Sequence, residues 1–178
     1  MNRMTPVVAL STALVSLSGC DHPTSDGPPS IRLGDSVCAQ CNMIISSESW
    51  ATATIVEGPR GPEPRLFDDF NCQVNFEVEN PDAIILARWS HCYATTKWIP
   101  TESAHFLMSS ELRAPMGSQI AAFTSRSHAD ETRSSLTGDV MTFKVAWKRL
   151  GHSGACCHNE LEEEQIGEEE HHDASQDH

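Results

Sequence analysis

The stretch that decides the fold begins with Trp50-Ala51-Thr52-Ala53-Thr54-Ile55-Val56, and its β-branched residues predict a strand. A turn at 58–62 and a short returning strand at 65–67 follow. From Asp68 onward apolar residues recur at helical spacing, and Asn80-Pro81 ends this helix because the residue before a proline avoids helical geometry. The apolar run 83–89 has the length of a strand, so the predicted order is β-β-α-β.

The second half of the chain predicts a similar order, although the two halves share no visible sequence identity. Its predicted elements are an extended segment at 91–99, strands at 104–108 and 119–124, a helix at 125–135 and a final strand at 140–150. We therefore expect an α+β fold class, with two small sheet-and-helix units of ββαβ type packed together. These units would form a body of residues 36–150.

The start of the chain predicts export. Arg3 and the apolar run from Val7 to Leu17 are typical of a secretory signal, and the run is too short to span a bilayer stably. Leu17-Ser18-Gly19-Cys20 resembles the lipobox of bacterial lipoproteins, where the peptide is cut before a cysteine that is then lipidated. The alternative is a plain secretory signal with an incidental cysteine.

The expected organisation is therefore a signal peptide at 1–19 and a tether at 20–35 that starts with the lipidation site Cys20. Three prolines and the lack of an apolar period predict that this tether is flexible. We expect the protein on the periplasmic side of the cell envelope, held to the inner or the outer membrane by its lipid.

Acidity is concentrated at the end of the chain. The formal net charge is -13, but residues 151–178 hold nine Asp/Glu and no Lys or Arg, which leaves only -4 for residues 1–150. This tail has few apolar residues and is expected to be disordered. Its Cys156-Cys157-His158 could hold a soft metal ion, or the tail could be a solubilising segment with idle or oxidised thiols. No basic residues cluster with aromatic ones, so we expect no nucleic-acid binding.

Soft donors gather in Cys38-Ala39-Gln40-Cys41-Asn42-Met43. Two thiols and a thioether within six residues suit a thiophilic ion such as Cu(I). A C-x-x-C pair also permits a structural disulfide, half of a zinc site or a redox pair. In an oxidising compartment, either Cys38 with Cys41 or Cys72 with Cys92 could form a disulfide, and the sequence cannot decide the pairing.

The chain as a whole resembles the NosL family, the lipoprotein copper chaperones of nitrous oxide reductase maturation. The resemblance covers roughly residues 17–150 and combines the lipobox and the C-x-x-C-x-M stretch with four further segments: Tyr93 with Trp98-Ile99, the run 104–110, Pro115-Met116-Gly117 and Ala121-Ala122-Phe123. It implies two β-β-α-β units, Cu(I) as the bound ion, and partners in a NosDFY-type ABC transporter and nitrous oxide reductase. It implies no enzymatic activity.

The resemblance also suggests which residues bind the metal. Cys41 and Met43 match the family's Cys-x-Met, and Met116 matches its Pro-Met-Gly; many members have Gly where this chain has Asn42. The expected Cu(I) ligands are thus Cys41, Met43 and Met116, with Cys38 as an optional second thiolate. One thiolate with two thioethers favours Cu(I) over Zn(II). An imidazole could complete the site, the candidates being His91, His105 and His128, although each of these is expected to be an ordinary packed or surface histidine.

The competing hypothesis is an enzyme: a thiol-disulfide oxidoreductase that uses Cys38 and Cys41, or a thiol-based organometal lyase. Oxidoreductases of the thioredoxin type place C-x-x-C at a helix N-terminus after a strand. Here the pair precedes the first clear strand, so its position argues against redox catalysis.

Overall fold

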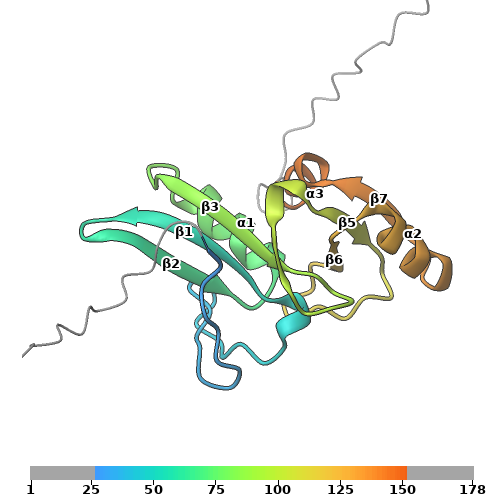
Figure 1. Ribbon diagram of the computed structural model, residues 1–178, viewed down its shortest axis with the longest axis horizontal. Coiled ribbons are helices and arrows are strands. Elements are labelled where there is room, and N and C mark those ends of the chain that lie inside the picture. The colour runs from blue at the N-terminus through green and yellow to red at the C-terminus, as the bar shows by residue number, and fades with distance from the viewer. Residues whose placement is uncertain (1–26, 152–178) are drawn as a thin grey trace, which may run out of the picture.

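The computed structural model describes residues 27–151 of the chain, which form two sheet-and-helix units side by side (Figure 1). The predicted signal peptide, the predicted lipidation site Cys20, the predicted tether up to residue 26 and the acidic segment beyond residue 151 lie outside the described residues. Among those described, no helix combines the length and apolar content that a membrane crossing requires.

The first unit is a four-stranded antiparallel sheet in the order β2-β1-β3-β4, with one helix, α1. Its elements are η1 (Glu48–Trp50), β1 (Thr52–Gly58), β2 (Gly61–Phe67), α1 (Phe70–Glu79), β3 (Ile85–His91) and β4 (Trp98–Pro100). The helix begins at Asp69, whose side chain accepts a hydrogen bond from the N–H of Asn71. This β-β-α-β order is the one that the sequence predicts.

The second unit is a three-stranded antiparallel sheet in the order β6-β5-β7. Its elements are η2 (Thr101–Ser103), β5 (His105–Met108), β6 (Ile120–Phe123), α2 (Arg126–Ser135), β7 (Asp139–Thr142) and α3 (Phe143–Gly151). Up to β7 the order is again β-β-α-β. The prediction of an α+β fold with two units of this type is confirmed.

The end of the body corrects the prediction of one strand at 140–150. The strand β7 ends at Thr142, and the helix α3 follows directly. Phe143, Ala146, Trp147 and Leu150 recur at helical spacing, and all four pack into one core cluster. The predicted strand over this apolar run is therefore wrong from Phe143 onward, where the run has a helical period.

A turn interrupts the segment predicted as extended between 91 and 99. Cys92 donates its N–H to the carbonyl of Lys97, and Thr96 has a positive φ of 51°. The chain therefore reverses between β3 and β4, which pair antiparallel.

Three core clusters hold the fold together. The first joins α1 and α3 to both sheets and includes Phe70, Val74, Phe106, Ile120 and Leu150. The second lies between the first unit and the N-terminal loop, and consists of Cys38, Ile45, Ala51, Phe67 and Cys72. The third, which includes Leu107, Phe123 and Ala129, fills the space between the second sheet and α2.

Candidate metal centre

The loop that carries Cys38 and Cys41 is a small hairpin in front of the first strand. Val37 and Ile44 form an isolated antiparallel bridge, and the N–H of Cys38 donates to the carbonyl of Met43 at 2.8 Å. At the tip, Asn42 has a φ of 60°, a left-handed conformation that asparagine adopts more readily than most residues.

Hydrogen bonds attach this loop to the body on both sides. The N–H of Ala39 donates to the carbonyl of Leu66 on β2, and the N–H of Gly34 donates to the carbonyl of Ile45. Ile31 packs against the second core cluster. Residues 31–35 are therefore held against the rest of the described chain.

Three sulfur atoms converge under this loop. The Sγ atoms of Cys38, Cys41 and Cys72 all lie within 4.8 Å of one another, and we call these residues the thiol cluster. Cys38 and Cys72 are buried, whereas Cys41 is half-buried. Cys72 lies in the first turn of α1, so the cluster joins two segments that are far apart in the sequence.

Cys72 is a member of this group that the sequence motif did not indicate. The alternative of a disulfide between Cys72 and Cys92 is not formed, since both are free thiols and belong to different core clusters. The bridge between Cys38 and Cys41 is not formed either. One signal in the sequence could have indicated Cys72 as a reactive thiol. It lies three residues after Asp69, at the start of a helix that follows a strand.

One thiol of the cluster is poised to ionise. The hydrogen bond from the Cys72 thiol lowers the pKa of Cys38 to about 5, and the backbone N–H groups of Cys41, Asp68 and Gln40 act in the same direction against the effect of burial. The same thiol–thiolate bond raises the pKa of Cys72, with burial as the second cause. Burial also raises the pKa of Cys41. At neutral pH the cluster thus carries one thiolate and two thiols.

Such a cluster suits a soft cation. A bound ion attracts the thiolate of Cys38 and drives the remaining thiols to lose their protons, because coordination strongly favours the thiolate form. Three sulfur donors match the ligand preference of Cu(I) and other thiophilic ions.

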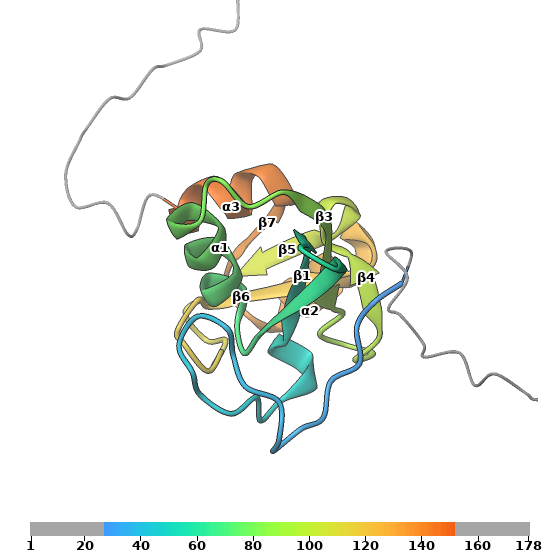
Figure 2. The same ribbon diagram turned by 90° about the vertical axis from the view of Figure 1, so that its left-hand side faces the viewer.

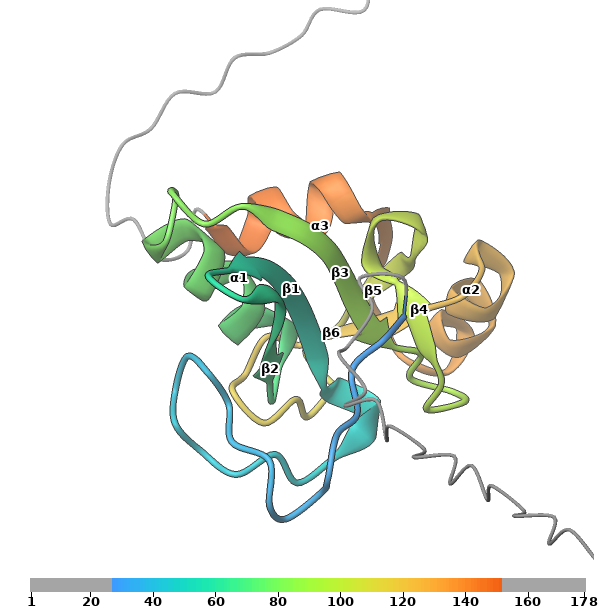
Figure 3. The ribbon, with the colours of Figure 1, turned by 60° about the vertical axis from the view of Figure 1, so that its left-hand side comes forward.

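Met116 lies against the same cluster. It is partly buried and packs on the core residues that include Cys38 and Cys72. Figures 2 and 3 show its loop, between β5 and β6, beside the N-terminal loop (blue) at the start of α1. Gly117, which follows, has a φ of 74° and allows the chain to turn sharply here.

Asp69 sets the position of the Met116 loop. Its Oδ2 accepts hydrogen bonds from the N–H groups of Met116 and Ser118, each at 3.1 Å, while its Oδ1 caps α1. The side chain of Asp69 is fully buried. One carboxylate therefore ties the loop of Met116 to the helix end that carries Cys72.

The structure does not gather all the predicted ligands. Cys38, Cys41 and Met116 come together, but the side chain of Met43 is 55% exposed and does not pack against the cluster. The backbone N–H of Met43 instead donates a hydrogen bond toward the sulfur of Cys41, which favours its thiolate.

The histidine candidates lie elsewhere. His91 is buried, stacks on Trp98 with ring centroids 3.7 Å apart and makes a 3.1 Å hydrogen bond with the carbonyl of Ala51. His105 lies on β5, and His128 is exposed on α2. Within residues 27–151, no histidine joins the thiol cluster.

Asp68 is a further acidic group beside the thiols. It is buried, its Oδ1 has no hydrogen-bond partner among the described residues, and its N–H faces the sulfur of Cys38. Burial raises the pKa of Asp68, and the nearby charge of Cys38 adds to this shift.

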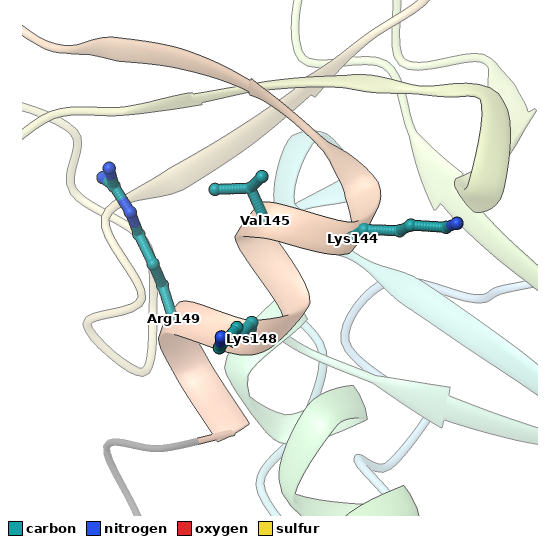
Figure 4. A pocket seen from close by; sticks show the side chains of 4 residues that line it. All are labelled: Lys144, Val145, Lys148 and Arg149. Carbon is teal, nitrogen blue, oxygen red and sulfur yellow. The ribbon is translucent and has the colours of Figure 1, made fainter. Parts of the chain in front are cut away.

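A separate pocket lies on the outer side of α3. It has a volume of about 510 Å³ and is lined by Lys144, Val145, Lys148 and Arg149, as Figure 4 shows. Its lining holds no thiol or imidazole, so it lacks the donors that a soft metal ion needs.

Comparisons with known proteins agree with the fold. The family model for NosL matches residues 31–147. A structure search found the crystal structure of the copper chaperone NosL from Shewanella denitrificans, with a TM-score of 0.51 and 16% sequence identity. The match covers 66% of this chain and 96% of that chain. A search of the curated proteins found no match. Because the family model spans well over half of the sequence, the chain belongs to the NosL family.

Proposed function

We propose that this protein is a periplasmic Cu(I) chaperone, and that the thiol cluster with Met116 is its ion-binding site. The observation that carries the proposal is the convergence of three sulfurs within 4.8 Å of one another. The copper chaperone from Shewanella denitrificans, which has the same fold, supports the choice of copper.

The coordination set explains how the ion would be held and released. Three thiolates and the Met116 thioether are soft donors, and none of the histidines that Zn(II) sites often use lies in the cluster. Cys41 is the half-buried member, so a ligand from an acceptor protein can approach the ion on its side. Ligand exchange can then proceed through a shared intermediate without exposing a bare ion.

The delivery route is part of the same proposal. By family resemblance, the ion passes to or from a NosDFY-type ABC transporter for assembly of the copper centre of nitrous oxide reductase, and lipidated Cys20 keeps the chaperone at the membrane. Membership of the NosL family supports this route. The protein acts as a carrier and not as an enzyme.

The test is a Cu(I) titration of reduced full-length protein against a chromogenic Cu(I) chelator. We expect one Cu(I) per chain, and Cys41→Ser, Cys72→Ser and Met116→Ala should each weaken binding at least about tenfold, since even outer-shell changes commonly cost that much. The matched control is Cys92→Ser, a buried cysteine of another core cluster, which should bind like the parent protein. Unchanged affinity in all three variants would reject the site.

A thiol-disulfide oxidoreductase remains the second candidate, because the low pKa of Cys38 and its contact with Cys72 resemble an activated thiol pair. Assays of disulfide reduction and of copper affinity on the same variants distinguish the two functions. An oxidoreductase reduces a disulfide substrate in a reaction that needs Cys38, and it is indifferent to Met116. A chaperone loses copper affinity in Met116→Ala and shows no turnover.

A further inference from the structure

We propose that the thiol cluster also binds trivalent arsenic, with arsenite forming one covalent bond to each of the sulfurs of Cys38, Cys41 and Cys72. The inference goes beyond the proposed function, because it needs the three thiols alone and neither Met116 nor copper. Bound arsenic occupies the place of Cu(I) and therefore blocks copper loading.

The spacing of the three sulfur atoms suits a single atom that bonds to all of them. The three Sγ atoms lie within 4.8 Å of one another, and all three residues are free cysteines. An atom at the centre of such a group lies at most about 2.8 Å from each sulfur, and a bond between zinc and sulfur measures roughly 2.3 Å. Small rotations of the side chains are therefore enough to bring all three sulfurs to bonding distance.

The number of thiols matches the valence of arsenic. Trivalent arsenic forms three bonds and keeps a lone pair, so three thiolates complete its coordination. Within residues 27–151, no carboxylate or imidazole joins the cluster. Cys92 belongs to a different core cluster and supplies no fourth thiol.

Met116 separates the chemistry of arsenic from that of copper. It packs against the thiol cluster, and its thioether is a soft donor for Cu(I). A thioether has no proton to exchange for an arsenic–sulfur bond, so it cannot take the place of a thiol. We therefore expect Met116→Ala to weaken Cu(I) binding more than arsenite binding.

The fold places the three thiols together before a ligand arrives. The N–H of Ala39, between Cys38 and Cys41, donates to the carbonyl of Leu66 on β2, and Cys72 lies in the first turn of α1. Donors that are already in position lose little further freedom when they bind. Cys41 is half-buried, so arsenite can reach the cluster from its side.

The reaction needs no oxidant and no reductant. Arsenite, As(OH)₃, exchanges its three hydroxyl groups for the three thiols. Three arsenic–oxygen bonds break and three arsenic–sulfur bonds form, while each thiol proton leaves with a hydroxyl group as water. Arsenic stays trivalent throughout, and the products are the arsenic trithiolate and three water molecules.

The experiment is a titration of reduced full-length protein with sodium arsenite, followed by mass spectrometry and arsenic X-ray absorption. Cys156 and Cys157 lie outside the described residues and are a second possible place for arsenic, so every protein in the series carries Cys156→Ser and Cys157→Ser. We expect one arsenic per chain and three sulfur neighbours around it. The expected mass gain is one arsenic atom minus three hydrogen atoms.

The variants Cys38→Ser, Cys41→Ser and Cys72→Ser should each bind arsenite at least about tenfold more weakly, because a positioned third donor acts at a high effective concentration. The adduct that remains should keep one hydroxyl group on arsenic, which its mass reveals. The matched control is Cys92→Ser, which should bind like the reference chain.

Two results would overturn the inference: an adduct with fewer than three sulfur neighbours in the reference chain, or equal arsenite affinity in the reference chain and Cys72→Ser. The count of sulfur neighbours requires no substitution in the cluster. It therefore decides the matter even where a serine variant fails to fold.

Competition with copper distinguishes this inference from the proposed function. Protein loaded with arsenite should bind no Cu(I) in chelator competition, and simultaneous binding of both would contradict a shared site. If Cu(I) binding depends on Cys41 and Cys72 but no trithiolate adduct forms, only the present inference fails. If the adduct forms while Cys41→Ser and Cys72→Ser keep full Cu(I) affinity, the proposed function fails and the inference stands.

Discussion

At the scale of single residues, the most consequential side chain outside the thiols is Asp69. It is fully buried and serves three N–H groups, those of Asn71, Met116 and Ser118. Because Cys72 follows it on α1 and Met116 lies on the loop that it holds, this carboxylate fixes the two parts of the site relative to each other. These hydrogen bonds offset the free-energy cost of burying a polar side chain.

Asp69→Ala removes the cap of α1 and leaves two amide groups without their acceptor. We expect the free energy of unfolding to fall by about 2–4 kcal/mol, from the loss of one cap and the cost of unpaired amides. Urea denaturation followed by circular dichroism measures this. The control is Asp35→Ala, an exposed residue paired with Arg32, which should change stability little.

The same variant tests the link to the site. In Asp69→Ala the Met116 loop loses both anchoring hydrogen bonds, so Cu(I) binding should weaken even under conditions where the protein is fully folded. If the folded variant binds Cu(I) as tightly as the parent protein, the hydrogen bonds from Asp69 are not needed to position Met116.

At the scale of elements, α3 decides how the two units pack. Its inner face contributes Ala146 and Leu150 to the core shared with α1, and Phe143 and Trp147 pack beside Arg88 of β3. Arg88 also pairs with Glu77 of α1 at 2.6 Å. Since α3 packs against both units, it holds them together.

Leu150→Ala should destabilise the protein by about 2–5 kcal/mol, because a buried leucine side chain is replaced by a cavity. Val145→Ala on the outer side of the same helix is the control, since Val145 is 43% exposed. Thermal or urea unfolding compares the two. Equal losses in both variants would contradict the orientation of α3.

At the scale of the whole molecule, the two units share one core and cannot be independent. Phe70 and Val74 from the first unit pack with Phe106 and Ile120 from the second. The N–H of Tyr93 also donates to the carbonyl of Ala122 across the boundary. The proposed ion-binding site depends on this packing, because the thiols come from the first unit and Met116 from the second.

We expect the reduced protein without metal to unfold in one cooperative transition, since a shared core couples the units. Tryptophan fluorescence and far-ultraviolet circular dichroism in urea should report the same midpoint. Cu(I) should raise this midpoint with concentration, because the ion binds the folded state. Two separate midpoints would show that the units fold independently.

The sequence by itself determined the class of fold and most of its elements. The β-branched run at 52–56, the helix stop at Asn80-Pro81 and the repeated β-β-α-β order are local patterns, and local patterns follow from the period of each element. The family resemblance suggested Cys41, Met43 and Met116 as ligands, with Cys38 as an optional second thiolate, and Cys38, Cys41 and Met116 all pack in or against the second core cluster. The prediction of a strand at 140–150 was wrong for residues 143–151, because a short apolar run is compatible with either a strand or a helix until its packing partners are known.

Only the tertiary structure decided the composition of the site. Cys72 joins Cys38 and Cys41 because α1 begins beneath the N-terminal loop, and Met43 lies apart from them, with 55% of its side chain exposed. Distances between segments far apart in the chain arise from packing, which no local pattern encodes. For the same reason the pKa of Cys38 could not be inferred beforehand, since it depends on a hydrogen bond from a thiol 34 positions away.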